Sequence, residues 1–359
     1  MAASRISIFG SHSGHNKGDV AILDSMVERF QQEPDLSQII VPSKDPSYLR
    51  NVLETDGVHV TPALTNYLDW RIPRYLRVSD AVIIGGGGLI FDRRLFSPGY
   101  NHLTNIYILT RLCKLLRVDY YLFSVGVDEL TNRAARRMFR SVIHSATGVS
   151  VRDQYSLEQT QRYTTETISL CPDPALRLSP KRSNRVETTK AQLGATDRPI
   201  IGIFVNESIQ GYRDRFVEAV RILSNKYQVY VGQTRTDQSF AHETAASVEA
   251  NCDPMFEENH LNGHAHIQLM HHFDRTVCVP MHSSIFSYVA GTPYLSIAYQ
   301  PKVRAFNELV DNEFVLSLDR IDQIPDHIEK LDGQHLRPKE ELTEQVENGF
   351  TSVIDSIRK

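Results

Sequence analysis

The chain has 359 residues, well above the roughly 150 residues that serve as a prior for one domain, so two domains are expected. Its 41% hydrophobic and 23% charged residues are typical of a soluble globular protein, and no apolar run approaches the roughly 18 to 20 residues of a membrane span. With 39 basic and 43 acidic residues the formal net charge is -4, which excludes a protein held on nucleic acid by its overall charge.

The N-terminal sequence and the cysteines bear on the cellular compartment. MAASRISIFG enters a strand-like run without the charged region, apolar stretch and cleavage site of a secretory signal, which predicts a cytoplasmic protein. The cysteines form no C-x-x-C pair, so their spacing suggests neither a zinc site nor a redox motif. We expect no metal, and we expect buried thiols for most of Cys113, Cys171, Cys252 and Cys278.

Strand-like runs alternate with helix-like segments through the first half of the chain. Such alternation is typical of an α/β fold, with a parallel sheet covered by helices on both faces. Strands are predicted at 5–10, 38–43, 57–62, 80–88, 120–127 and 148–153, and helices at 19–31, 102–116 and 131–146. Residues 1–180 are therefore predicted to form a Rossmann-like domain.

A second alternating series follows a polar stretch without periodicity, Lys181 to Pro199, which we interpret as a linker. Residues 200–359 are predicted to form a second Rossmann-like domain, and its C-terminal helix at 339–357 could pack back on the first domain. Two such domains imply an interdomain cleft, a favoured place for a ligand. Strands are predicted at 200–206, 227–234, 275–280, 293–299 and 313–318, and further helices at 212–226 and 240–251.

The first stretch that could carry chemistry is GSHSGHNKGD, residues 10–19, which follows a strand and opens a helix. Its glycines Gly10, Gly14 and Gly18 allow a tight turn and close approach of the backbone to a ligand, and the helix N-terminus favours an anion. The spacing does not fit a Walker A motif. Alternatively, Asp19 only caps the following helix.

Four consecutive glycines, Gly85 to Gly88, end the predicted strand at 80–88. A dinucleotide fingerprint is weakly supported, because Ile90 stands where a third small residue is needed. We favour a close backbone approach to a ligand at the carboxyl edge of the sheet over a plain turn.

Charged residues follow the strand at 148–153. Arg152 could fork two N–H groups onto a carboxylate or phosphate, although an Arg152–Asp153 surface pair is the simpler interpretation. Asp173 lies between two prolines in CPDPA, a rigid turn that would fix its carboxylate or serve structure alone.

His282 follows the strand RTVCVP, and Lys302 follows the next strand, PYLSIAY. Because successive parallel strands often lie side by side, both residues could meet at one sheet edge. A lone histidine is more often structural than catalytic, so the pair needs independent support.

That support is a family resemblance. In order and spacing, a set of stretches spanning Arg5 to Phe306 resembles the polysaccharide pyruvyl transferase family. These stretches are GHNKGDVAIL, DAVIIGGGGLI, SVGVDEL, VSVRDQYSLE, PDPALRL, MHSSIFSYVAGTPYLSIAY and PKVRAF. The resemblance implies a two-domain fold similar to GT-B glycosyltransferases. It also implies transfer of pyruvate from phosphoenolpyruvate to sugar hydroxyls as a ketal, with release of phosphate.

The resemblance assigns the donor-binding arginine, histidine and lysine of the family to Arg152, His282 and Lys302. It predicts His282 and Asp173 as catalytic residues. The cations would hold phosphoenolpyruvate without a metal or other cofactor, and His282, with an ordinary pKa of about 6.5, would protonate the enol carbon or only hold the phosphate. Acceptor contacts are expected from the loop residues Asn16, Gly18 and Asp19 and from the glycines Gly86, Gly87 and Gly88.

Two departures from the family pattern stand out. Many relatives carry an arginine two residues before the histidine, where this chain has Pro280, so Arg304 is a candidate replacement in donor binding. Asp128 and Glu129 stand where relatives often carry Gly–Pro, which would change acceptor contacts.

The prediction is therefore a cytoplasmic pyruvyl transferase acting on a lipid-linked precursor of a cell-surface polysaccharide or exopolysaccharide at the inner membrane face. The expected partners are phosphoenolpyruvate and a saccharide. Peripheral contact with the membrane is compatible with this prediction, and nucleic acid is not an expected partner. Alternatives are a nucleotide-sugar glycosyltransferase of the GT-B type and a catalytically degenerate sugar-binding member of an assembly complex, for which Pro280 is the best argument.

Overall fold

A computed structural model describes residues 4–13, 15–53, 57–65, 67–97, 99–183, 186–187, 198–234, 239–248, 251–252 and 262–359. The chain divides into two compact units. Unit 1 comprises Met1–Gly14, Asp19–Arg177 and Leu342–Lys359, and unit 2 comprises His15–Gly18 and Leu178–Glu341. The C-terminal helix thus belongs with the first unit, and four residues near the N-terminus belong with the second. Most of the predicted linker, 184–185 and 188–197, lies outside the described residues.

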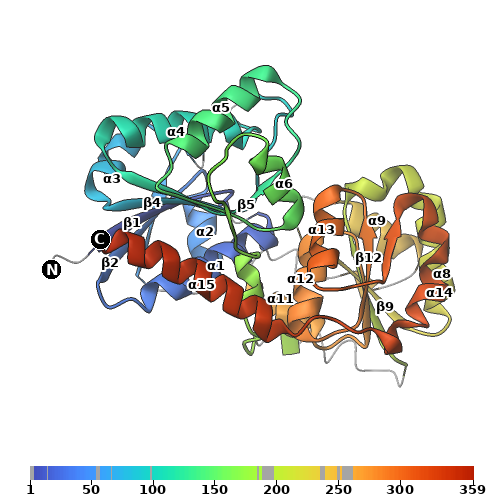
Figure 1. The fold of residues 1–359 in the computed structure, drawn as a ribbon. Coiled ribbons are helices and arrows are strands. Elements are labelled where there is room, and N and C mark those ends of the chain that lie inside the picture. Colours follow the sequence, from blue (N-terminus) through green and yellow to red (C-terminus); the bar gives the residue numbers. More distant parts are fainter. Residues whose placement is uncertain are drawn as a thin grey trace. The chain divides into compact units, whose positions relative to one another are not determined.

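Unit 1 is built on a parallel sheet of seven strands in the order β3-β2-β1-β4-β5-β6-β7. The strands are β1 (Ser4–Phe9), β2 (Leu36–Ser43), β3 (Val58–Pro62), β4 (Ala81–Ile90), β5 (Asp119–Val127), β6 (Gly148–Val151) and β7 (Ser169–Leu170). The helices are α1 (Lys17–Gln31), α2 (Pro46–Val52), α3 (Ile72–Val78), α4 (His102–Leu116), α5 (Arg133–His144), α6 (Gln154–Gln161) and α15 (Lys339–Ile357). Figure 1 shows α3, α4 and α5 on one face of this sheet and α1, α2 and α15 on the other.

The glycine run does not end β4, because the strand continues through it to Ile90. Gly85 and Gly86 are explained by packing: a Cβ at Gly85 would lie 2.2 Å from the carbonyl oxygen of Phe123, and one at Gly86 would lie 1.9 Å from the side chain of Ile22. Gly86 and Gly87 also have φ values of +72° and +86°, which favour glycine. Close approach of neighbouring protein atoms therefore accounts for these glycines without a ligand.

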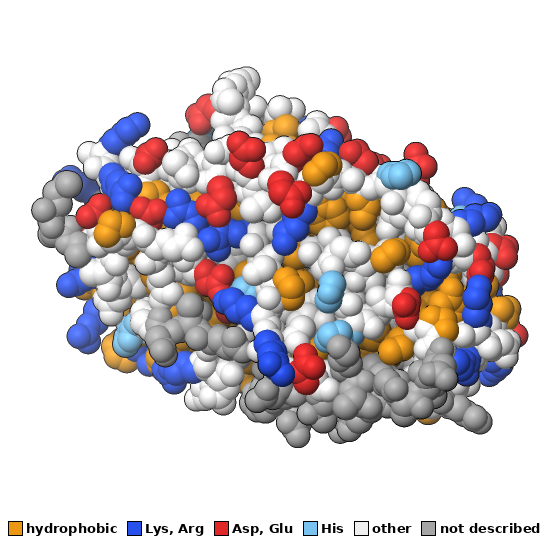
Figure 2. Space-filling model, turned by 90° about the horizontal axis from the view of Figure 1, so that it is seen from below, with side chains coloured by type: hydrophobic (Ala, Val, Ile, Leu, Met, Phe, Trp, Pro, Cys, Tyr) orange, Lys and Arg blue, Asp and Glu red, His pale blue; other side chains and the backbone are white. Residues whose placement is uncertain are grey.

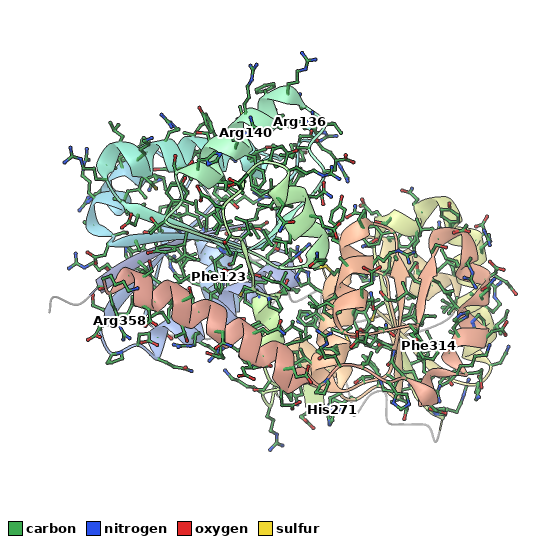
Figure 3. The ribbon with its side chains drawn as sticks, viewed as in Figure 1. Phe123, Arg136, Arg140, His271, Phe314 and Arg358 are labelled. Atoms are coloured by element: carbon green, nitrogen blue, oxygen red, sulfur yellow. The ribbon has the colours of Figure 1, made fainter. Side chains whose placement is uncertain are left out.

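Helix α15 packs on unit 1 through an aromatic cluster. The ring of Phe350 lies 5.4 Å from that of Phe30 and 4.6 Å from that of Phe123 in β5. Figure 3 shows Phe123 between the sheet and α15. Glu347 accepts hydrogen bonds from Arg29, at 2.7 Å, and from Arg177. The last helix of the chain thereby completes the core of the first unit.

Unit 2 is built on a parallel sheet in the order β10-β9-β8-β11-β12-β13. The strands are β8 (Ile200–Val205), β9 (Gln228–Gln233), β10 (Asn251–Cys252), β11 (Arg275–Cys278), β12 (Tyr294–Ala298) and β13 (Val315–Ser317). The helices are α8 (Arg213–Ser224), α9 (Ser239–Ser247), α11 (Gly263–Met270), α12 (Met281–Ala290), α13 (Pro301–Leu309) and α14 (Ile324–Ile328). Helices α11, α12 and α13 cover one face of this sheet, and α8, α9 and α14 cover the other (Figure 1).

The predicted α/β fold class, with two parallel sheets covered by helices, is confirmed. Several helix ends differ from the prediction by about one to four residues: α1 begins at Lys17 rather than at Asp19, α5 spans Arg133–His144, and α9 ends at Ser247, with Asn251 in β10. The short helices α2, α3, α11, α13 and α14 were not predicted, since so few residues give too few turns for a clear period. No helix in the described part of the chain combines the length and apolarity needed to cross a bilayer.

Candidate active site

His282 and Lys302 lie at the carboxyl edge of the unit 2 sheet. Each is the second residue of a helix that follows a strand, His282 in α12 after β11 and Lys302 in α13 after β12. The two strands are parallel neighbours, with Cys278 opposite Ser296, so the predicted strand adjacency is confirmed. Helix N-termini with a histidine and a lysine in their first turns form an edge suited to an anion.

Pro280 is the N-cap of α12, with an extended backbone at φ -64° and ψ 137°. Its carbonyl accepts hydrogen bonds from the backbone N–H of Ser283 at 3.1 Å and from the hydroxyl of Ser283 at 2.6 Å. The proline therefore fixes the turn that leads into His282 but supplies no positive charge. Arg304, the candidate replacement, lies at an exposed position of α13.

The segment His15–Gly18 lies at the same edge of unit 2. The backbone N–H of Lys17 donates to the carbonyl of Thr234, the residue after β9, at 2.9 Å. A Cβ at Gly18 would lie 2.0 Å from Nδ1 of His282, so the imidazole packs directly on the backbone at Gly18. Only glycine leaves room for this ring at this position.

The role expected of Asp19 as a helix cap is wrong. Asp19 lies inside the first turn of α1, where its negative charge is favourable, and the carboxamide oxygen of Asn16 accepts from the N–H of Gly18 at 3.1 Å. Asp19 belongs to unit 1, and a Cβ at Gly87 would lie 3.3 Å from its Oδ1. The stretch 10–19 thus leads from β1 into α1 as predicted, with Asn16 rather than Asp19 as the cap, and Gly14 lies outside the described residues.

Arg152 lies at the carboxyl edge of the unit 1 sheet, directly after β6. Its Nε is 3.1 Å from Oδ2 of Asp153 and its Nη1 is 3.9 Å from Oδ2 of Asp173. The Arg152–Asp153 pair is therefore confirmed, but the three side chains are each only 4% exposed, so the pair does not lie at the surface. Asp153 also caps α6 by accepting from the N–H of Ser156 at 2.7 Å.

The guanidinium of Arg152 rests on glycine backbone. A Cβ at Gly126 in β5 would lie 2.8 Å from its Cζ, and one at Gly88, the glycine paired with Gly126 across the sheet, would lie 3.8 Å from its Nη2. Gly88 is exposed, unlike the three glycines before it. Gly126 therefore makes the space that this buried arginine occupies, whereas a Cβ at Gly88 would only touch the guanidinium at an ordinary contact distance.

Asp173 has an altered acidity. Burial raises its pKa from 3.8 to about 6, although Arg152 and the N–H of Ala175, which donates to Oδ1 at 3.0 Å, act in the opposite direction. A carboxyl group with a pKa near neutrality can both give and accept a proton at physiological pH.

The sequence profile of the polysaccharide pyruvyl transferase family matches residues 16–301, which include both sheet edges. The chain belongs to this family. Its membership supports a pyruvyl-transfer role in polysaccharide biosynthesis. A comparison with curated protein sequences found no significant match.

Solved structures show the fold of this pyruvyl transferase family member. The UDP-GlcNAc 2-epimerase of Methanocaldococcus jannaschii is similar with a TM-score of 0.66 and 8% identity, over 97% of this chain and 99% of that one. The Anabaena protein Alr3699/HepE, in complex with UDP-glucose, is similar with a TM-score of 0.61 and 11% identity, over 97% and 94% of the two chains. At such identities the likeness shows the shared GT-B-like fold alone.

Sequence reasoning missed Lys17 at the edge of unit 2. The residue is fully buried, and this burial lowers the pKa of its amino group to about 8. Its charge also contributes to lowering the pKa of the buried His266, which falls to about 3 mainly by burial. Lys17 stands between two predicted site residues, but a lysine in a polar loop is normally read as exposed.

His12, which follows β1 at the carboxyl edge of unit 1, was also missed. It is 1% exposed, and neither ring nitrogen has a hydrogen-bond partner among the residues that the structure describes. Burial and the nearby His102 lower its pKa to about 3, so the ring is neutral at physiological pH. The loop sequence contains His12 but offers no spacing that distinguishes it from a surface residue.

Proposed function

We propose that this family member transfers the pyruvyl group of phosphoenolpyruvate to two hydroxyls of a saccharide, forming a pyruvate ketal and releasing phosphate. The family match carries the proposal. It is supported by His282 and Lys302 in the first turns of helices that follow adjacent strands, an arrangement suited to the anionic donor.

The proposed reaction uses residue types that both sheet edges supply. An acid protonates the methylene carbon of phosphoenolpyruvate, which makes the neighbouring carbon electrophilic, and one sugar hydroxyl adds there and loses its proton. Phosphate leaves with its bonding electrons and takes up one proton, and the second hydroxyl adds at the same carbon and loses its own proton, which closes the ketal. We assign the acid role to His282, held in place against Gly18, and the stabilisation of anionic oxygens to Lys302 and Arg152.

Asp173 is the second proposed proton carrier. Its raised pKa suits acceptance of a proton from a sugar hydroxyl, a role that an ordinary aspartate, with a pKa near 4, performs poorly at neutral pH. The buried Arg152 beside it would keep the carboxylate oriented. Arg304, which is exposed, is proposed only as an outer donor contact.

The acceptor is proposed to be a lipid-linked precursor of a cell-surface polysaccharide or exopolysaccharide, modified in the cytoplasm at the inner membrane face. Asn16, Gly18 and Asp19 with Gly86, Gly87 and Gly88 remain the proposed acceptor contacts, although packing and capping already explain several of them. Of these glycines, only Gly88 is exposed.

A thermal-shift comparison tests the donor. Phosphoenolpyruvate should raise the melting temperature, whereas UDP and GDP should not, because a ligand stabilises only the state that binds it. Acceptor-dependent phosphate release should fall by about 100-fold or more in His282→Ala, the scale of a lost general acid. His335→Ala, which removes an exposed histidine, is the control and should retain full activity.

The structural neighbours favour one competing function. Alr3699/HepE was solved with UDP-glucose, so a nucleotide-sugar glycosyltransferase is the second candidate. Stabilisation by UDP or GDP without any effect of phosphoenolpyruvate would select it. A protein that is stabilised by saccharide alone and releases no phosphate would instead be a binding member of an assembly complex. Pro280 is the argument for this outcome, because it replaces an arginine of many relatives.

A further inference from the structure

Unit 1 exposes large apolar side chains at the carboxyl edge of its sheet. In the connection from β3 to α3, Leu64 is 80% exposed and Trp70 is 82% exposed. In the connection from β4 to α4, Phe96 is 71% and Tyr100 is 64% exposed. Exposing such side chains to water is unfavourable, and grouped exposure marks an interaction surface more often than isolated exposure does.

The helices attached to these connections carry only one sign of charge. Helices α3, α4 and α5 pack side by side on one face of the sheet (Figure 1) and contain no aspartate or glutamate. Their basic residues are all exposed, and Figure 3 shows Arg136 and Arg140 projecting away from the sheet. These residues are Arg74, Arg77, Arg111, Lys114, Arg133, Arg136, Arg137 and Arg140.

This concentration of positive charge is local, because the chain as a whole is acidic by four charges. Figure 2, which views the molecule from below, shows acidic and basic side chains intermixed on that side. Helix α15, which from Leu342 onward covers the other face of the unit 1 sheet, carries Glu344, Glu347 and Asp355 there and no lysine or arginine. Opposite faces of one sheet therefore differ in charge.

We propose that the α3–α5 face, defined as the outer surfaces of α3, α4 and α5 with the described parts of the connections 63–71 and 91–101, docks on the surface of an anionic phospholipid bilayer. The arginines contact lipid head groups, and the exposed apolar side chains enter the interface. This proposal depends on the proposed function in one respect: docking on a membrane is useful because the proposed acceptor saccharide is carried on a lipid.

The apolar component favours a bilayer over nucleic acid. Phosphate backbones attract arginines equally well, but aliphatic side chains such as Leu64 and Leu115, which is 76% exposed, gain nothing from them. Tryptophan and tyrosine are typical of the membrane interface, and both occur here beside arginine: the guanidinium of Arg71 lies 5.4 Å from the Trp70 ring centroid, and that of Arg94 lies 4.8 Å from the Tyr100 ring centroid.

The face is also placed to serve the site. Phe96 and Tyr100 lie in the connection that leaves β4, the strand that contains the exposed Gly88 near the guanidinium of Arg152. A bilayer at these connections would hold a lipid-linked saccharide close to the carboxyl edge of unit 1. Bilayer docking would thus raise the local concentration of acceptor without changing the donor site.

The sole tryptophan of the chain, Trp70, makes the test direct. The 359-residue chain is mixed with vesicles of phosphatidylcholine, with or without phosphatidylglycerol, and bound protein is measured by sedimentation. We expect binding only to the anionic vesicles, a blue shift of Trp70 emission on binding, and release in about 0.5 M salt because ions screen the head groups. Leu64→Ala with Phe96→Ala should weaken binding several-fold.

Charge variants provide the matched comparison. Arg133→Glu, Arg137→Glu and Arg140→Glu together should lower vesicle binding by at least about tenfold. Arg320→Glu, Lys330→Glu and Lys359→Glu make the same change in net charge at exposed positions of other elements and should leave binding within about twofold.

Three results would overturn the proposal: no binding of the wild type to anionic vesicles, equal losses in both triple variants, or binding without a shift of Trp70 emission, which would indicate charge attraction alone. Tighter binding to duplex DNA than to vesicles would count equally against it. Stabilisation by phosphoenolpyruvate should be unchanged in both triple variants, so a failure of membrane docking can be told from a failure of the proposed pyruvyl transfer.

Discussion

At the scale of single residues, unit 1 holds Arg152 between two carboxylates rather than exposing it to solvent. Asp153 forms an ion pair with the arginine and also caps the start of α6. Asp173 lies 3.9 Å from the arginine, and its pKa is raised. Burying an ionised carboxylate lowers the stability of the fold. Buried carboxylates with shifted pKa values are therefore found mostly where they have a function.

Asp173→Asn is therefore expected to stabilise the protein above pH 6. Because the folded state binds the proton of Asp173 more tightly than the unfolded chain, stability from this group is fully present below pH 3.8 and is lost as the pH rises through about 6. The variant should be more stable than wild type by about 1 to 3 kcal/mol at pH 8 and equal to it near pH 3.5. Urea unfolding at several pH values measures this difference.

The same variant should lose most of its phosphate-release activity, since the amide cannot carry a proton. Full activity of Asp173→Asn would show that the carboxylate carries no proton in the reaction, and a lower stability than wild type at pH 8 would show that its charge stabilises the fold.

Gly18→Ala tests the contact between Gly18 and His282. An alanine in a helix is normally more favourable than glycine by about 1 kcal/mol, but here its Cβ would lie 2.0 Å from Nδ1 of His282. We expect a destabilisation of about 1 to 3 kcal/mol from the overlap, together with reduced phosphate release because His282 must move. Gly211→Ala, where no atom lies within 4 Å of the new Cβ, should be neutral in melting temperature and activity.

At the scale of elements, α15 completes the core of a unit whose other elements precede it by more than 160 residues. Phe350 is fully buried between Phe30 and Phe123, so Phe350→Ala should destabilise unit 1 by about 3 to 5 kcal/mol, measured by urea unfolding. Thr351→Ala, at an exposed position of the same helix, is the control. Equal stability of the two variants would mean that α15 contributes little to this core.

At the scale of the whole molecule, the uneven distribution of charge matters more than its sum. A net charge of -4 excludes strong overall attraction to polyanions, yet α3, α4 and α5 together present eight basic and no acidic side chains. Such a distribution lets one face attract anionic surfaces while the rest of the protein repels them. The sequence contains this segregation, but only the fold brings the three helices onto one face.

The sequence by itself determined where the longer strands and helices lie, because buried parallel strands read as short apolar runs and the longer helices show a clear period. It also placed His282 and Lys302 after adjacent strands, since consecutive parallel strands tend to pair. Motif order identified the family, which the profile match confirms.

Only the tertiary structure decided which neighbours each site residue has. The burial of Arg152 against Gly126, the packing of His282 on Gly18, and the burial of Lys17 all depend on contacts between segments far apart in sequence. The pKa of Asp173 likewise follows from burial, which no local pattern encodes. Local sequence sets backbone geometry, whereas close approach and desolvation arise only when distant segments pack together.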